Sequence, residues 1–162
     1  DQKGFFAGTL GEISLRITGG KFLITPADKP LCLLTEEALC LAPIEKISSE
    51  VDKKFPKHLH WHQCIYKNTS AKVVVVCQPV YAMLLANCLQ KPKRDLLQQA
   101  NRLVDLVEIM PEKEVDGNSA WKEEGIFFVP SVGMLLWGDS FSSLVDRIEI
   151  IEQISLLSVI GN

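Results

Sequence analysis

The sequence predicts an α/β sandwich built around a mixed sheet. Short runs of β-branched and aliphatic residues alternate along the chain with segments of helical periodicity. Hairpin patterns lie near both ends of this series. The length of 162 residues is typical of one domain, so we expect a single domain over residues 1–162. Because the chain starts at Asp1, almost directly at a glycine-rich strand signal, we also expect an N-terminal segment upstream of it.

Composition and charge narrow the function classes. Hydrophobic residues make up 47% of the chain and charged residues 23%, which is typical of a globular domain. A net charge of −3 argues against a nucleic-acid partner and against an anionic membrane surface. The five cysteines include no C-x-x-C pair, and no apolar run is long enough to span a membrane. We therefore expect a cytoplasmic protein without nucleic-acid or membrane partners.

Residues 11–25 are expected to form a β-hairpin. Apolar and polar residues alternate over residues 13–18, which is the period of a half-buried strand. Gly19-Gly20 is typical of a two-residue hairpin turn, and residues 22–24 form the return strand. A further strand is predicted over residues 39–44.

The middle of the chain alternates between helix and strand. Pro56 can occupy the first turn of a helix that runs through Tyr66. Residues 73–76 are all valine, which indicates a strand buried on both faces. A second helix is expected over residues 80–89. A third is expected from Pro92 to Val107, because its apolar residues recur at helical spacing.

The C-terminal part is predicted to close the sheet and to add a long helix. Residues 111–124 are polar and charged and are expected to form a loop or an exposed edge. Residues 126–129 and 134–137 have the pattern of two short strands. Ser140 is a typical N-cap for the last helix, whose apolar stripe extends to Ile154.

Five segments occur in an order that is typical of one protein family. They are Gly8–Arg16 (GTLGEISLR), Phe22–Pro26 followed by Leu34–Leu39 (FLITP and LTEEAL), His62–Tyr66 (HQCIY), Val73–Ala82, and Gly133–Gly138 (GMLLWG). Together they resemble the class II aldolase and adducin family, which includes fuculose-phosphate aldolase, ribulose-phosphate epimerase and methylthioribulose-phosphate dehydratase. The resemblance implies a three-layer α/β/α sandwich with a mixed, largely antiparallel sheet. It also implies a homo-oligomer, with a tetramer as the oligomeric state that is common in the family.

The same resemblance implies where a zinc site would lie. Family members hold zinc with three histidines, and a glutamate moves the proton. Counted along the matched motifs, the three ligand positions are Val76, Gln78 and Val132, and the glutamate position is His58. Valine has no donor atom and glutamine is a poor zinc ligand. We therefore expect no cofactor, with zinc or another divalent metal as the alternative.

The phosphate-binding positions of the family are also altered. Its asparagine position is Glu12, whose carboxylate would repel a phosphate. Lys57 stands where the family has one of two serines, and it could meet an anion only as a single point charge. The remaining pocket positions match the family and are expected to preserve turn geometry: Thr9, Gly11, Thr25 and Pro26.

The chain's three histidines, His58, His60 and His62, lie within five residues. On a strand they would share one face, and on a helix His58 and His62 would lie one turn apart, a spacing that can chelate a metal. No acidic or cysteine ligand has an obvious matching spacing. A relocated metal site and a set of histidines without any ligand therefore both remain open.

These observations leave three hypotheses about function. The leading one is a domain of this family that has lost zinc-dependent aldolase activity and serves as a binding or assembly module, with a protein partner as one option. The second is a sugar-phosphate aldolase or epimerase type of enzyme, a metal-dependent aldehyde-lyase, with its metal moved to the three histidines. The third is a sensor of a small neutral ligand in the altered pocket.

Overall fold

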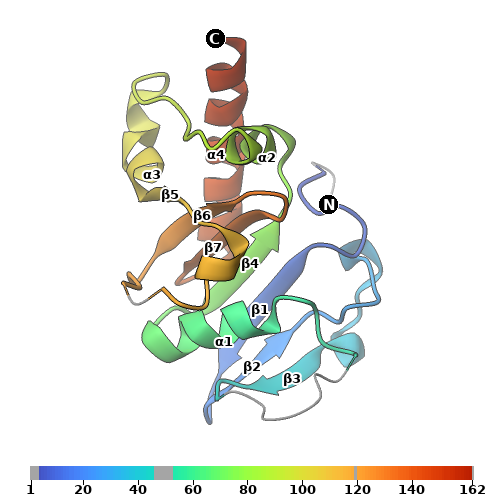
Figure 1. The fold of residues 1–162 in the computed structure, drawn as a ribbon. Coiled ribbons are helices and arrows are strands. Elements are labelled where there is room, and N and C mark those ends of the chain that lie inside the picture. The colour runs from blue at the N-terminus through green and yellow to red at the C-terminus, as the bar shows by residue number, and fades with distance from the viewer. Residues whose placement is uncertain (1–3, 46–52, 119, 162) are drawn as a thin grey trace.

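The computed structural model describes residues 4–45, 53–118 and 120–161. It contains one seven-stranded sheet in the order β3-β2-β1-β4-β7-β6-β5 (Figure 1). The strands are β1 (Glu12–Ile17), β2 (Lys21–Ile24), β3 (Cys40–Pro43), β4 (Val73–Cys77), β5 (Val107–Ile109), β6 (Gly125–Val129) and β7 (Gly133–Gly138). The α-helices are α1 (Leu59–Asn68), α2 (Val80–Asn87), α3 (Asn101–Leu106) and α4 (Phe141–Ile160). Short 3-10 helices span Leu31–Leu33, Glu36–Ala38, Gln98–Ala100 and Glu112–Glu114.

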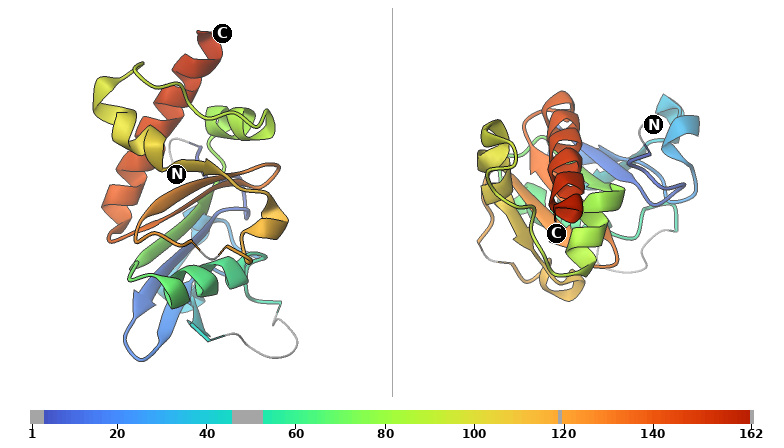
Figure 2. Two further views of the ribbon diagram at one scale, coloured as in Figure 1. Left: turned by 60° about the vertical axis from the view of Figure 1, so that its left-hand side comes forward. Right: turned by 90° about the horizontal axis from the view of Figure 1, so that it is seen from above.

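The sheet is mixed and largely antiparallel, as predicted. The pair β5 and β6 is parallel, and the other five pairs of neighbouring strands in the described sheet are antiparallel. Helix α1 lies on one face, and α2, α3 and α4 lie on the other (Figures 1 and 2). This arrangement confirms the three-layer α/β/α sandwich. Seen from above, α2 and α4 lie over the centre of the sheet, and strands β1 to β3 extend beyond them (Figure 2, right).

The valine run forms the central strand β4, and it is buried on both faces as predicted. Val74 and Val76 belong to the apolar core under α1, whereas Val73, Val75 and Cys77 belong to the core under α2 and α4. This alternation follows from the two-residue period of a strand. A β4 with two buried faces holds the two helical layers together.

The hairpin is present, with two differences from its prediction. Its loop has three residues, because Ile17 pairs directly with Lys21, and both Gly19 and Gly20 have positive φ. Strand β1 is half-buried, but its most buried side chains are the polar Glu12 and Ser14, at 3% and 1% exposure. These polar side chains have hydrogen-bond partners on α1, as described below, and these bonds offset the cost of burying them.

The predicted helix over residues 92–107 is wrong for most of its length. Helix α3 is only six residues long, and Val107 pairs with Ile126 in the parallel strand β5. Asp95 has a φ of 66°, which no helix allows, and it exchanges hydrogen bonds with the side chain of Asn101. The two bonds close residues 95–101 into a loop, so helix begins only after them.

The other helix predictions are closer to the structure. Helix α1 begins at Leu59 rather than at Pro56, whose carbonyl accepts a hydrogen bond from the Leu59 N–H. Helix α4 begins after Ser140, and Ser140 Oγ accepts a hydrogen bond from the Ser143 N–H, as expected of an N-cap. The predicted loop 111–124 contains a short 3-10 helix and buries Val115 completely.

Candidate functional site

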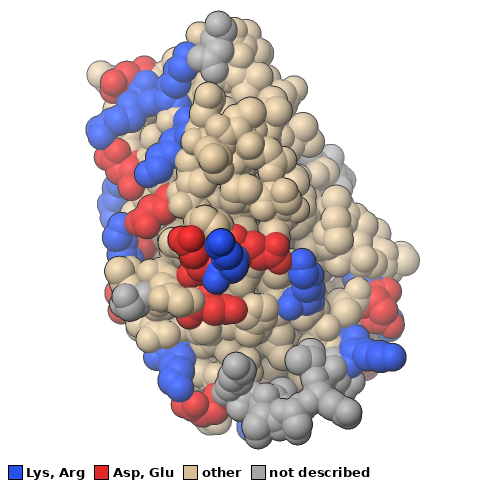
Figure 3. All heavy atoms as spheres, in the orientation of Figure 1, with Lys and Arg blue, Asp and Glu red and all other residues tan. Residues whose placement is uncertain are grey.

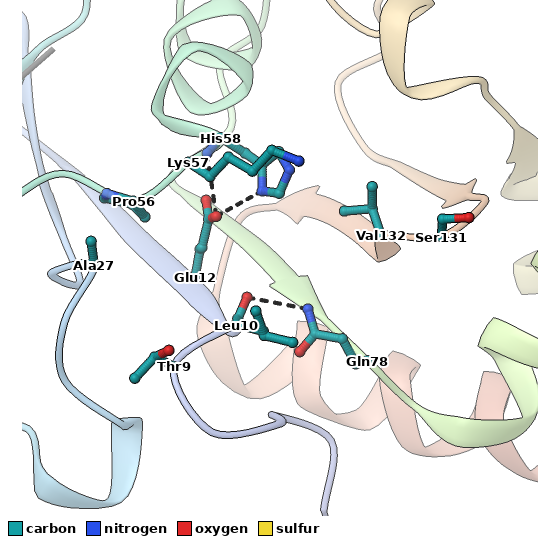
Figure 4. A pocket seen from close by; sticks show the side chains of 10 residues that line it. All are labelled: Thr9, Leu10, Glu12, Ala27, Pro56, Lys57, His58, Gln78, Ser131 and Val132. Atoms are coloured by element: carbon teal, nitrogen blue, oxygen red, sulfur yellow. Dashed lines mark hydrogen bonds and ion pairs between the residues drawn. The ribbon is translucent and has the colours of Figure 1, made fainter. Parts of the chain in front are cut away.

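A cavity of about 280 Å³ lies where β1 begins, β4 ends and α1 starts (Figure 4). Glu12 is directly opposite Val76 in the antiparallel pair of β1 and β4, so the start of one strand and the end of the other share this edge of the sheet. The loop between β6 and β7 forms the facing wall. The whole cavity is lined by Thr9, Leu10, Glu12, Ala27, Pro56, Lys57, His58, Gln78, Ser131 and Val132.

The buried carboxylate of Glu12 lies on one wall of this cavity. Its Oε1 accepts hydrogen bonds from the His58 imidazole, at 2.7 Å from Nδ1, and from the His58 backbone N–H at 3.3 Å. Its Oε2 lies 3.2 Å from His62 Nε2. Burial alone would raise the pKa of Glu12, but the hydrogen bonds from the two imidazoles and their charges outweigh it and lower the pKa to about 2. Glu12 is therefore ionised at neutral pH.

A chain of buried hydrogen bonds continues from Glu12 through α1 back to β1. His62 Nδ1 lies 2.6 Å from Ser14 Oγ, and Ser14 Oγ lies 2.8 Å from the Tyr66 hydroxyl. Burial raises the pKa of Tyr66, so the phenol keeps its proton and can donate it to a neighbour. Because His62 and Tyr66 lie one turn apart on α1, the helix presents both side chains to the same face of β1.

The His58 ring is held from two sides. Nδ1 is bonded to Glu12, and the ring stacks on Trp61 with a centroid distance of 4.0 Å and an interplanar angle of 22°. Its other nitrogen, Nε2, is buried and has no hydrogen-bond partner among the described residues. The nearest charged oxygen is Oε1 of Glu112 at 3.8 Å, beyond hydrogen-bond distance.

The third histidine does not join this group. His60 Nε2 pairs with Asp116 Oδ2 at 3.0 Å on the half-exposed side of α1, and His60 borders a separate surface hollow. His58 and His62 thus meet at Glu12, whereas His60 points elsewhere. Within the described ranges, no group of three histidine, cysteine, aspartate or glutamate side chains is arranged to hold a metal ion.

The three positions at which the resemblance implies zinc ligands are near one another but carry no ligand set. Val76 is fully buried in the apolar core under α1, and Val132 packs partly against the same core. The Gln78 amide bonds to the loop before β1, donating to Leu10 O at 3.2 Å and accepting from Ala7 N at 3.4 Å. Gln78 thus fastens this loop to the end of β4.

The β6–β7 turn is pressed against the end of β4 through Gly133. Its φ is 142°, and a Cβ at this position would lie 2.2 Å from the Cys77 carbonyl oxygen. Only glycine fits such an approach. Gly133 therefore places Val132 and Ser131 at the cavity.

Of the positions expected to preserve turn geometry, three are buried and one lines the cavity. Thr25 Oγ1 accepts a hydrogen bond from Ile13 N at 3.1 Å, and Pro26 beside it is buried. Gly11 is buried against the Phe6 ring. Thr9, by contrast, is exposed and lines the cavity.

Lys57 also lines the cavity, and its Nζ pairs with Glu112 Oε1 at 2.9 Å. The ammonium of Lys57 is therefore partly neutralised where it stands. Sequence reasoning missed the partnership of Ser14 and Tyr66 with His62. The signal available for it was a serine at a position that shares a strand face with Glu12.

One face of the molecule carries both signs of charge. On the face drawn in Figure 3, Lys and Arg side chains are interspersed with Asp and Glu. None of the helices in the described part of the chain is long and apolar enough to cross a membrane.

Comparison with solved structures shows the same fold in other proteins, two of which are aldolases. L-fuculose-1-phosphate aldolase from Thermus thermophilus matches with a TM-score of 0.83 and 20% identity, over 99% of this chain and 88% of that one. YgbL from Escherichia coli matches with a TM-score of 0.80 and 20% identity, over 99% and 83%. L-fuculose 1-phosphate aldolase from Glaciozyma antarctica PI12 matches with a TM-score of 0.77 and 15% identity, over 99% and 69%.

Among curated protein sequences, none matches the chain. Residues 1–159 match the sequence profile described as the class II aldolase and adducin N-terminal domain. That match covers nearly the whole chain. The chain belongs to the class II aldolase and adducin N-terminal domain family.

Proposed function

We propose that this domain has lost the zinc-dependent chemistry of its family and serves as a binding or assembly module. The observation that carries the proposal is the chemistry of the three ligand positions. Zinc needs nitrogen, sulfur or carboxylate donors. Val76 and Val132 have none, and both amide atoms of Gln78 are bonded to the backbone of the preceding loop. The residues present do not fit a zinc ion at the family's position.

The replaced glutamate supports the same proposal. At position 58 the family's proton-moving carboxylate is exchanged for an imidazole, and a carboxylate stands instead at Glu12. Glu12 is only 3% exposed, and its two oxygens are engaged by His58 and His62. A carboxylate held in this way stabilises two imidazoles, and its low pKa makes it a weak base.

A retro-aldol assay tests this proposal directly. The protein, purified without a histidine tag, is incubated with L-fuculose 1-phosphate and added zinc, with the Thermus thermophilus aldolase as the active control. We expect no release of aldehyde above the rate without protein. Zinc-dependent turnover that co-purifies with the protein would overturn the proposal, and its loss in His58→Ala would assign it to the altered site.

An assembly role has its own support on the far side of the sheet. Leu15, Leu23 and Leu41 are directly paired across β1, β2 and β3, and Leu15 and Leu41 remain 47% and 49% exposed. Adjacent apolar side chains at the surface are typical of a protein contact. We propose that this row contacts a second copy of the chain in a homo-oligomer.

Light scattering coupled to gel filtration tests the homo-oligomer. The wild-type protein is expected to elute as an oligomer, and Leu41→Glu is expected to shift it towards the monomer. A matched exposed leucine away from the row, Leu33→Glu, should leave the mass unchanged. A monomeric wild-type protein would contradict the assembly through this face.

Two exposed thiols bear on the cellular location of the protein. Cys32 and Cys88 are exposed and unpaired. Exposed thiols of this kind persist in a reducing compartment. We therefore propose a cytoplasmic protein, to be tested by fractionation of cells that express it.

A further inference from the structure

We propose that the cavity beside Glu12 holds a small neutral polyhydroxy compound. One hydroxyl of this ligand donates a hydrogen bond to Nε2 of His58. The inference deepens the proposed function and rests on it, because it takes the altered cavity as a place of binding. Three observations carry it: the orientation of His58, the buried nitrogen without a partner among the described residues, and the charges that line the cavity.

Glu12 sets which nitrogen of His58 carries a proton. Nδ1 lies 2.7 Å from an ionised carboxylate oxygen, which accepts only, so Nδ1 must be the N–H donor. In the neutral imidazole, Nε2 then carries the lone pair and acts as an acceptor. The stacking of the ring on Trp61 keeps the imidazole in this orientation. The site therefore favours a ligand that brings a hydrogen-bond donor.

The acceptor at Nε2 is left without a partner in the described part of the protein. The His58 side chain is only 9% exposed, and Nε2 itself is buried without a hydrogen bond to any described residue. A buried polar atom in this state costs free energy until a partner reaches it. His58 forms part of the cavity wall (Figure 4). A ligand that enters the cavity can supply the missing donor.

The charges of the cavity favour a neutral ligand over an anion. Glu12 is a fixed negative charge in the wall, which disfavours a phosphate ester. Lys57 lines the same cavity, but its ammonium is paired with Glu112 Oε1 at 2.9 Å and therefore offers a phosphate little attraction. A hydroxyl group brings a donor without a charge. Thr9 and Ser131 add hydroxyl groups to the lining, which suit further hydroxyls of the ligand.

The size of the cavity sets the class of compound. Its volume of about 280 Å³ is close to the lower limit of small-molecule pockets, which is about 300 Å³. A single monosaccharide or a short polyol is of a size that suits this volume. The proposed ligands are therefore free sugars and polyols of five or six carbons.

Saturation-transfer NMR on the full chain tests the proposal. L-fucose and ribitol are the neutral probes, and L-fuculose 1-phosphate is the anion. We expect saturation transfer to a neutral probe and weaker or no transfer to the anion. His58→Gln should weaken the affinity of the protein for the neutral probe about tenfold, because one hydrogen bond is lost.

The neighbouring substitution His60→Gln is the matched control. It makes the same change two residues away, at a side chain that borders another hollow, and should leave binding unchanged. If His58→Gln does not fold, the wild-type protein still decides the question. Long-range ¹⁵N–¹H spectra should show His58 protonated at Nδ1, with Nε2 shifting when the neutral probe is added.

Each outcome separates this inference from the proposed function. Transfer to the phosphate ester alone, or equal binding by wild type and His58→Gln, would overturn the neutral ligand while leaving the loss of zinc chemistry intact. A His58 proton on Nε2 would also overturn it, as would the absence of transfer to both neutral probes. Zinc-dependent cleavage of the phosphate ester would instead overturn the proposed function.

Discussion

Replacing the carboxylate of Glu12 should remove an acid-dependent part of the protein's stability. Its pKa is lowered from 4.5 to about 2 in the folded protein. The difference of about 2.5 pKa units corresponds to about 3 kcal/mol in the free energy of unfolding at neutral pH. Glu12→Gln keeps the size of the side chain and removes the charge, so we expect it to lower the stability by about this amount.

The sign of the pH dependence follows from the lowered pKa. A carboxyl group with a depressed pKa in the folded state stabilises the protein above the unfolded value of 4.5. This contribution is lost as the pH falls from about 4.5 towards about 2. The difference between wild type and Glu12→Gln should therefore be largest at neutral pH and shrink as the solution becomes acidic.

Urea unfolding between about pH 7 and about pH 3 measures this difference directly. Glu114→Gln is the matched control, since this carboxylate is exposed and should behave as wild type throughout. A difference that stays constant over the acidic range would refute the reasoning, as would a Glu12→Gln protein as stable as wild type at neutral pH. If Glu12→Gln does not fold, the ¹³C chemical shift of the Glu12 carboxyl in the wild type gives its pKa.

Two further substitutions test the packing around the site. Ser14→Ala removes the hydroxyl that His62 and Tyr66 share, so it should lower the free energy of unfolding in urea by about 2 kcal/mol. An unchanged unfolding midpoint would contradict the buried chain of hydrogen bonds. Gly133→Ala places a methyl group 2.2 Å from a backbone oxygen at positive φ and should cost at least about 2 kcal/mol. Gly117→Ala should leave the melting temperature nearly unchanged, because a Cβ there would lie at an ordinary contact distance of 3.8 Å from the Glu114 carbonyl oxygen. Equal effects of the two glycine changes would contradict the close approach.

Local patterns were sufficient to predict much of the fold. The valine run could only be a strand with two buried faces, and Ser140 marked the start of α4 correctly. The motifs of the family placed both elements in the right architecture. In these segments each residue's preference agrees with its tertiary environment, which is why the sequence alone was informative.

Other features depend on partners that are distant in sequence or that override a local pattern. Residues 92–100 have helical spacing, but Asp95 and Asn101 bond to each other and close a loop before α3 begins. The apolar residues of β1 alternate as predicted, yet Leu15 is 47% exposed and Ser14 is buried. The polar face of β1 is buried because α1 and the residue before it supply its hydrogen-bond partners, and the sequence of the strand does not show these partners.

The candidate site was predictable in its parts and unpredictable in its geometry. The motif comparison marked Glu12 and His58 as replacements, one where the family has asparagine and one where it has glutamate. Nothing in either motif indicated that the two replacements face each other at 2.7 Å. The strand that carries Glu12 and the helix that carries His58 meet only through the packing of α1 on the sheet.

The central claim, the loss of zinc chemistry at the family's site, is tested most directly by the metal content of the protein purified without a tag. Mass spectrometry of metals is followed by zinc titration. We expect less than one zinc ion per chain. We also expect no saturable zinc uptake at micromolar concentration that is sensitive to Gln78→Ala. One zinc ion per chain, tightly bound and released by Gln78→Ala, would show that these positions still form the family's metal site and would contradict the account.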